Sequence, residues 1–150
     1  MYDELKLKNQ LCYPIYLCSK EIIRKYSKYL DKIDLTYTQY VVMMYFWEVE
    51  TSNVKDLANT ILIDSSTLTP LLKKLEQKGF IERNISKKDE RNLVLKLTKK
   101  GLKLRDEAKE IPKLMGECFN LTDDESKDLY LLLYKVLHNI EEEIRNDKRN

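Results

Sequence analysis

The chain has 150 residues, the length of one domain, and carries a formal net charge of +2. Hydrophobic residues make up 43% of it and charged residues 35%, a composition too apolar for a disordered chain. No apolar run approaches the roughly 20 residues that cross a bilayer, and the first residues do not resemble a signal peptide. We therefore expect one folded domain over residues 1–150, located in the cytoplasm.

The charged residues are distributed unevenly along the chain. Between Lys73 and Arg105 there are twelve basic residues and four acidic ones, whereas from Glu110 to Asn150 there are ten acidic and six basic residues. A basic middle beside an acidic tail is typical of a protein that directs one surface at a polyanion and another elsewhere.

The first half of the chain is expected to be helical, because it has few glycines and prolines. Apolar residues recur at helical spacing from about residue 6 to residue 30. Pro14 interrupts this pattern, so the helix either begins near Pro14 or is kinked there. Thr36 and Gln39 fit a capping box that opens a second helix, which continues through Trp47.

Two short amphipathic helices follow and are joined by a tight turn. The first runs from Val54 to about Ile63, and the second starts after the candidate N-cap Asp64 and ends at Gly79. Its apolar stripe includes Leu68 and, further along, three more leucines at helical spacing. Two such helices form the helix-turn-helix pattern.

The apolar period changes to two after Gly79, which predicts two strands near residues 81–85 and 93–97 with a charged hairpin tip between them. Thr98 can cap a further helix that reaches about Cys118 and contains Pro112. A second capping box, residues 122–125, opens the last helix. We therefore expect a mainly α fold with a small β-hairpin wing, that is, a winged helix-turn-helix.

This arrangement predicts a DNA-binding surface. Recognition helices enter the major groove with their first residues nearest the bases. Small hydroxyl side chains at that position can bond to base edges or phosphates; here they are Ser65, Ser66, Thr67 and Thr69. Lys73 and Lys74 lie a turn further on and are expected to meet the DNA backbone.

The hairpin tip is predicted to enter the minor groove. Arg91 is the candidate for insertion, because a narrow groove concentrates negative potential, and Asp89 can hold its guanidinium through a charge-assisted pair. Lys87 and Lys88 add positive charge at the tip. Arg83, on the first wing strand, either contacts phosphate or pairs with Asp64.

Several stretches resemble the MarR family of bacterial regulators: DSSTLTPLLKKLE (64–76), DERN (89–92) and LTKKG (97–101). The stretches NQLCY (9–13) and LTYTQY (35–40) resemble its organic-hydroperoxide-sensing, OhrR-like branch. The order of elements fits the family over essentially the whole chain.

This resemblance implies a homodimer in which residues 1–35 and 111–150 form dimerisation helices around a DNA-binding lobe, residues 36–100. It implies that Cys12 is the peroxide-sensing cysteine and that Tyr26 and Tyr37 hydrogen-bond its thiolate. Two residues depart from the family pattern. Ser66 replaces a usual glycine in the recognition helix, and Pro14 follows the reactive cysteine closely.

A redox-sensing thiol must be ionised, because the thiolate attacks peroxide. Tyrosine hydroxyls that donate hydrogen bonds, or a nearby helix N-terminus, would favour the anion. Cys12 and Tyr26 are 14 residues apart, which is about 21 Å along one straight helix. If Tyr26 supports Cys12, it therefore most simply comes from the other subunit, while Tyr16 can contribute from the same chain.

The other two cysteines are predicted to play different roles. Cys18 is turned about 240° around the helix from Cys12, so a disulfide between the two within one helix is not expected, and Cys18 is predicted to fill the core. In some members of the OhrR-like branch, the oxidised cysteine forms a disulfide with a second cysteine of the partner subunit, at a position close to that of Cys118 in this sequence. Two alternatives therefore stay open: a disulfide between Cys12 of one subunit and Cys118 of the other, and a mixed disulfide with a small cellular thiol. The cysteine spacings, with the single His138, match no zinc site, and we expect no metal and no cofactor.

The predicted function is a regulator, acting as a repressor, that leaves an inverted-repeat operator in double-stranded DNA when an organic hydroperoxide or related oxidant oxidises Cys12. A MarR-type repressor that responds to a small aromatic ligand is the main alternative. A thiol peroxidase, an architectural DNA-binding protein and an inert buried thiol at Cys12 are the others.

Overall fold

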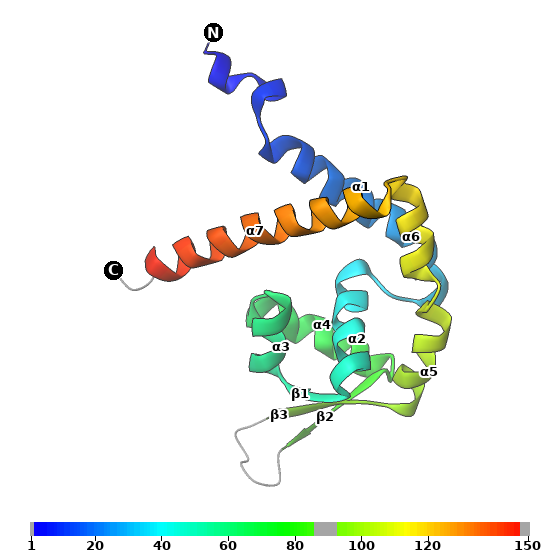
Figure 1. Ribbon diagram of the computed structural model, residues 1–150. Coiled ribbons are helices and arrows are strands. Elements are labelled where there is room, and N and C mark those ends of the chain that lie inside the picture. The colour runs from blue at the N-terminus through cyan, green and yellow to red at the C-terminus, as the bar shows by residue number, and fades with distance from the viewer. Residues whose placement is uncertain (1, 86–92, 148–150) are drawn as a thin grey trace. The chain divides into compact units, whose positions relative to one another are not determined.

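The computed structural model describes residues 2–85 and 93–147, and the chain divides into two compact units, Met1–Pro112 and Lys113–Asn150. The helices, labelled in Figure 1, are α1 (Cys12–Leu30), α2 (Tyr37–Val49), α3 (Val54–Ile61), α4 (Ser65–Gln77), α5 (Lys99–Ala108), α6 (Ile111–Phe119) and α7 (Asp123–Asp147). The strands are β1 (Thr51–Asn53), β2 (Ile81–Ile85) and β3 (Leu93–Leu97). Short 3-10 helices occupy Asp3–Leu5, Leu7–Asn9 and Asp31–Ile33. The mainly helical fold with a small wing is confirmed.

The first helix begins near Pro14, which is one of the two alternatives that the sequence left open. The expected start near residue 6 is replaced by two 3-10 turns, and α1 starts at Cys12 and runs unbroken to Leu30. Pro14 is the third residue of α1, where its missing N–H costs nothing because the first N–H groups of a helix have no partner within it. Pro14 therefore lies in the first turn, and Cys12 opens the helix.

A second proline divides what the sequence predicted as one helix. Instead of running from Thr98 to Cys118, the chain forms α5, which ends at Ala108, and α6, which begins at Ile111. Pro112 is the second residue of α6, a position that tolerates proline, whereas the interior of a longer helix does not.

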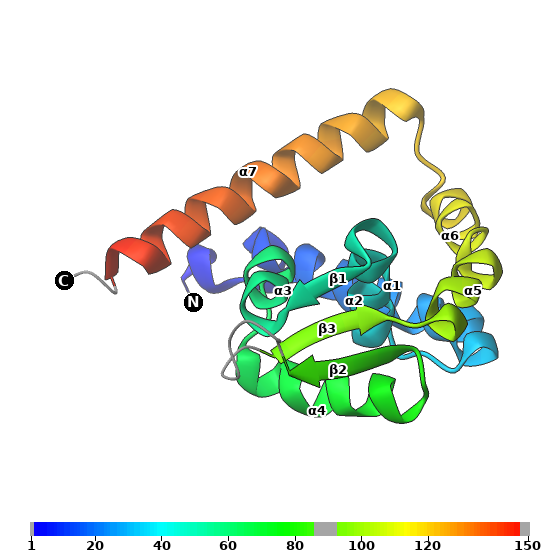
Figure 2. The same cartoon turned by 90° about the horizontal axis from the view of Figure 1, so that it is seen from below.

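The wing is a three-stranded antiparallel sheet in the order β1-β3-β2, with its strands side by side in Figure 2. The sequence analysis missed β1, which has only three residues and no alternating pattern. It is held by pairing of Ser52 with Leu95, and the hydroxyls of Ser52 and Tyr45 lie 2.7 Å apart in a hydrogen bond.

The core of the first unit lies between α2, α3, α4 and the sheet. Its fully buried side chains include the predicted leucines Leu68, Leu72 and Leu75 of α4, together with Met43 and Leu57. The predicted capping box at Thr36 and Gln39 is present, and Thr98 caps α5. The leucine stripe thus determines which face of α4 packs on the core, and the Thr98 cap determines where α5 begins.

Gly101, in the first turn of α5, allows a close approach to the turn before β2. A Cβ atom there would lie 2.1 Å from the carbonyl oxygen of Phe80. The Trp47 Nε1–H donates to the Gly101 carbonyl at 2.9 Å, and the Thr98 hydroxyl donates to the Gly79 carbonyl at 2.6 Å. The first turn of α5 is therefore held against α2 and against the residues that follow α4 by hydrogen bonds.

The second unit contains the long helix α7. The predicted capping box is present: the Thr122 N–H donates to Glu125, and the Glu125 N–H donates to the Thr122 hydroxyl. An apolar stripe along α7 is exposed, and its members are Leu129, Leu132, Leu133, Val136, Leu137, Ile140 and Ile144. Among the described helices, none is long and apolar enough to cross a membrane.

Candidate nucleic-acid interface and redox centre

The start of α4 presents the predicted hydroxyl side chains outward. Ser65, Ser66, Thr67 and Thr69 are all exposed, while Leu68 between them is buried. The Thr69 hydroxyl donates to the Ser65 carbonyl at 2.9 Å. Lys73 and Lys74 follow on the exposed side. A polar, outward-facing helix start followed by lysines fits a groove-reading helix.

Asp64 occupies the predicted N-cap position without the expected side-chain hydrogen bond. Its carbonyl accepts hydrogen bonds from the N–H groups of Thr67 and Leu68. Backbone N–H groups in the first turn of α4 are thus left to donate hydrogen bonds to a phosphate oxygen.

Arg83 pairs with Glu76 rather than with Asp64. Its Nε donates to Glu76 Oε2 at 2.7 Å, and both side chains are partly exposed. The hydrogen bond and charge of Arg83 lower the pKa of the Glu76 carboxyl. Because Glu76 lies on α4 and Arg83 on β2, the pair fixes the wing to the recognition helix.

The residues predicted for the wing tip lie outside the described residues: Lys87, Lys88, Asp89 and Arg91. The paired strands β2 and β3 run up to this segment from both sides.

Tyr26 and Tyr37 are brought together by the fold. Their ring centroids lie 4.9 Å apart, and Tyr26 also contacts Tyr40 at 5.8 Å. Burial raises the pKa of Tyr40 to about 12, with further contributions from Tyr26 and Tyr37. Burial and the neighbouring Tyr37 also raise the pKa of Tyr26. Tyr26 and Tyr40 therefore stay protonated at neutral pH, and hydroxyls in that state can donate hydrogen bonds to an anion.

Cys12 lies at the opposite end of α1 from this tyrosine pair. It is exposed and is the first residue of the helix, which has no side-chain cap. The unbroken helix keeps Cys12 and Tyr26 of one chain apart, as the spacing of 14 residues predicts. Tyr16, one turn from Cys12, is 61% exposed. One chain therefore contains both parts of the predicted sensor without joining them.

The other cysteines are also free thiols. Cys18 is exposed, so the expectation that it fills the core is wrong for a single chain, because the first half of α1 covers no core. Cys118 is exposed and its thiol donates to the Leu114 carbonyl at 3.2 Å. Among the described residues, no group of three metal-ligating side chains occurs.

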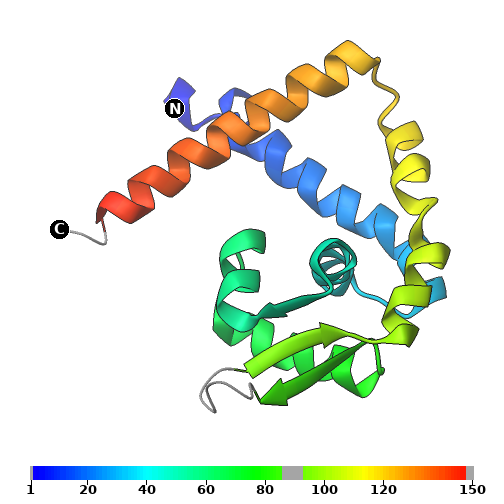
Figure 3. The same cartoon turned by 60° about the horizontal axis from the view of Figure 1, so that its bottom comes forward.

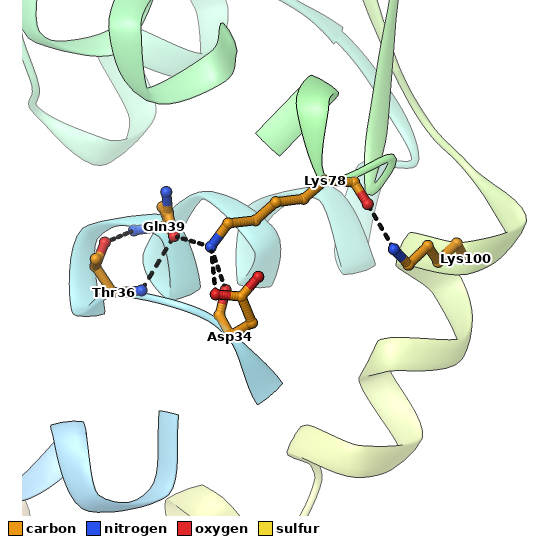
Figure 4. A network of polar contacts seen from close by, with 5 residues as sticks. All are labelled: Asp34, Thr36, Gln39, Lys78 and Lys100. Atoms are coloured by element: carbon orange, nitrogen blue, oxygen red, sulfur yellow. Dashed lines mark hydrogen bonds and ion pairs between the residues drawn. The ribbon is translucent and has the colours of Figure 1, made fainter. Parts of the chain in front are cut away.

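Sequence reasoning missed two residues near the recognition helix, Glu76 and Lys78. Lys78 connects the end of α4 to the turn between α1 and α2 through Asp34 and Gln39 (Figure 4). Its position directly before Gly79 was the available signal, because basic residues often bond to carbonyl groups near a helix end.

These features define a winged helix-turn-helix protein that binds DNA. The family described as transcriptional regulator SarA/Rot matches residues 24–108. The HTH-type transcriptional regulator SarZ of Staphylococcus haemolyticus (strain JCSC1435) is 45% identical over 133 residues, covering 89% of this chain and 90% of its own. The organic hydroperoxide resistance transcriptional regulator of Bacillus subtilis (strain 168) is 38% identical over 139 residues, covering 93% and 95%.

Among solved structures, reduced AbfR bound to DNA has a TM-score of 0.77 and 31% identity, covering 92% of this chain and 96% of its own. Structures of AbfR also exist for the overoxidised protein bound to DNA and for a disulfide-formed state, with TM-scores of 0.74 and 0.65.

The chain therefore belongs to the SarA/Rot family of transcriptional regulators and is a MarR-type regulator of the OhrR-like kind. Its relatives are regulators and not enzymes, which removes the thiol peroxidase alternative.

Proposed function

We propose that this regulator is a homodimeric repressor that leaves its operator when an organic hydroperoxide oxidises Cys12. The observation that carries the proposal is the separation of the two sensor parts. Tyr26 and Tyr37 form a pair at one end of α1, and Cys12 stands exposed at the other end. A second copy whose α1 runs the opposite way would bring the pair of one chain to the cysteine of the other.

The exposed apolar side chains support the dimer. Ile15 and Leu17 on the first half of α1 are exposed, as is Leu11 just before the helix, and α7 has its own exposed stripe. Burying such surface contributes about 25 cal/mol per Å². We assign residues 1–35 and 111–150 to dimerisation and residues 36–100 to DNA binding, all within one domain of a cytoplasmic protein.

For DNA we assign the hydroxyl residues at the start of α4 to the major groove and Lys73 and Lys74 to phosphates. A symmetric dimer places two such helices on an inverted repeat in double-stranded DNA. The wing tip, with Lys87, Lys88, Asp89 and Arg91, is assigned to the minor groove. Arg83 supports the wing through Glu76 instead of contacting phosphate.

The sensing chemistry proceeds in two steps. The Cys12 thiolate attacks the outer peroxide oxygen, the O–O bond breaks, and the leaving alkoxide takes up a proton, which gives a sulfenic acid and an alcohol. A second thiol then attacks the sulfenic sulfur, water leaves, and a disulfide forms. The second thiol is either Cys118 of the partner subunit or a small cellular thiol.

We attribute release from DNA to the disulfide rather than to the oxidised sulfur itself. This is supported by AbfR, whose overoxidised form has been solved on DNA while a disulfide-formed state has also been solved. A covalent link at Cys12 constrains α1, which contacts α2 of the DNA-binding lobe (Figure 3).

The direct test uses a DNA duplex that the reduced wild-type protein selects from a random library. Its dissociation constant is measured with and without one equivalent of cumene hydroperoxide in the presence of glutathione. We expect the wild type to lose affinity, Cys12→Ser to keep it, and Cys18→Ser, altered on the same exposed helix, to behave as wild type.

Binding by the wild type that ignores peroxide, or full sensitivity in Cys12→Ser, would refute the redox proposal. Release by a phenolic compound in both proteins would instead favour the aromatic-ligand alternative. Cys118→Ser tested without glutathione then separates the two disulfides.

A further inference from the structure

The turn between α1 and α2 lies between the two helices that carry the tyrosine pair, Tyr26 and Tyr37. After Leu30 the chain makes a 3-10 turn, passes through Asp34 in the left-handed region at φ 53°, and enters α2 at its N-cap, Thr36. Tyr37 is the first residue of α2, directly after this turn. The backbone of Tyr37 is therefore continuous with the last residues of the turn.

The Lys78 side chain is anchored on this turn (Figure 4). Its ammonium donates to Asp34 Oδ1 at 2.9 Å, to the Asp34 carbonyl, and to Gln39 Oε1 at 3.3 Å. The same Gln39 oxygen accepts the Thr36 N–H of the capping box at 3.1 Å. Lys78 is 25% exposed at its side chain and Gln39 only 3% exposed, so this ammonium is largely withdrawn from solvent.

The Lys78 backbone is anchored on two other elements. Lys78 is the C-cap of α4, and its N–H donates to the Lys74 carbonyl at 3.0 Å. Its carbonyl accepts from the Lys100 ammonium of α5 at 2.7 Å. Gly79 follows at φ 75° and ends the helix. Lys78 is therefore hydrogen-bonded to three elements: the α1–α2 turn, the recognition helix α4 and α5.

We propose that Lys78 is a positioning residue that couples the redox state of the sensor to the orientation of α4. This inference rests on the proposed redox function. When Cys12 enters the disulfide, the tyrosine hydroxyls lose their thiolate acceptor, and the start of α2 shifts together with the capping-box oxygen that Lys78 shares. The Lys78 ammonium shifts together with its three acceptors, and this displaces the C-terminal end of α4. The N-terminal end of the same helix is the end assigned to the major groove.

Coupling is measured as the dissociation constant of the oxidised protein divided by that of the reduced protein, on the selected duplex. Allosteric couplings of this kind amount to roughly 5- to 150-fold. Lys78→Met keeps an unbranched side chain, shorter by one atom, but removes all three hydrogen bonds. It is expected to lower the wild-type coupling at least about fivefold, while the rate of Cys12 oxidation stays within about twofold of wild type.

Two matched variants separate positioning from mere stability. Lys78→Arg retains the charge and N–H donors and should restore part of the coupling, because a planar guanidinium does not reproduce an ammonium that donates to three acceptors. Lys103→Met removes an exposed lysine of α5 and should leave the coupling at the wild-type value. Wild-type coupling in Lys78→Met, or equal losses in Lys78→Met and Lys103→Met, would overturn the inference.

Asp34→Asn provides an independent variant that is expected to fold, because Asp34 is 77% exposed at its side chain and asparagine tolerates the left-handed region. It removes the charge of the ion pair and should lower the coupling about twofold, an effect in the range of a partly exposed pair. Unchanged coupling in both Asp34→Asn and Lys78→Met refutes the inference while the redox proposal stands. A wild-type protein without any coupling refutes the redox proposal itself.

Discussion

The DNA-binding lobe and the first half of α1 differ in how much of their structure one chain completes. In the lobe, Tyr40, Met43 and Leu75 are buried, and α4, α5 and the wing are tied together by side-chain hydrogen bonds. In contrast, every side chain from residue 11 to residue 20 is exposed, including Cys12. The lobe is a finished structure within one chain, whereas the first half of α1 exposes apolar side chains such as Ile15 and Leu17, which we propose a second copy covers.

The largest effect is expected from breaking the dimer at α7. Leu133→Lys places a charge on the apolar stripe, and burying an unpaired charge is very costly. We expect monomers in sedimentation experiments and a loss of at least about a hundredfold in DNA affinity, because the two half-sites no longer act together.

Leu131→Lys is the matched control. Leu131 lies about 200° around the helix from Leu133, on the side away from the stripe, and it is also exposed. It should stay dimeric. Monomers in both variants, or in neither, would contradict the assigned interface.

A substitution inside the finished lobe should instead affect stability. Gly101→Ala forces a Cβ atom onto the Phe80 carbonyl, and overpacking of this kind lowers the free energy of unfolding by about 3 kcal/mol. Gly116→Ala is the control, since a Cβ there meets nothing within 4 Å. Urea denaturation should show a loss only for Gly101→Ala; similar stability of the two variants would speak against the close approach.

The tyrosine pair connects the two regions. Tyr26→Phe removes a donor to the thiolate and should slow oxidation of Cys12 by cumene hydroperoxide roughly tenfold, the lower end for a hydrogen bond to a charged group. Tyr29→Phe, on the same helix, should react at the wild-type rate. Stopped-flow thiol consumption measures both, and equal rates in all three proteins would remove the tyrosine from the sensor.

The smallest effect concerns the pair of Glu76 and Arg83. Because Arg83 lowers the pKa of Glu76 below its usual 4.5 in the folded protein, this carboxylate stabilises the fold above its unfolded pKa. The contribution is lost as the pH falls through the folded pKa. Glu76→Gln should therefore flatten the acid-side fall in unfolding free energy, and the exposed Glu82→Gln should not. An identical acid profile in both variants would count against the pair.

Local patterns predicted the helix caps and the buried face of α4 well. The capping residues Thr36 and Thr98 in the lobe, Thr122 in the second unit, and the leucines of α4 carry signals within a few positions of the chain, and all were confirmed. The strand β1 was missed because three residues hold no period, and its pairing depends on β3, more than 40 residues away.

The site was harder to predict than the fold. The partner of Arg83 and the anchoring of Lys78 depend on how α4 meets β2 and the α1–α2 turn, which no local pattern specifies. Cys18 was expected in the core because its helical spacing matches apolar neighbours, yet spacing cannot tell an intrachain core from a surface that awaits a second copy. The outward exposure of the hydroxyl side chains, by contrast, follows directly from their place at the start of α4.

The central claim is that two chains build each redox centre, and mixed dimers test it most directly. One dimer combines a Cys12→Ser chain with a Tyr26→Phe chain; the other combines a chain carrying both substitutions with a wild-type chain. Each retains one Cys12. If the tyrosine acts across the dimer, the first mixed dimer reacts with cumene hydroperoxide at the wild-type rate per thiol and the second reacts about tenfold more slowly. The reverse order would show that Tyr26 acts within its own chain and would contradict the account.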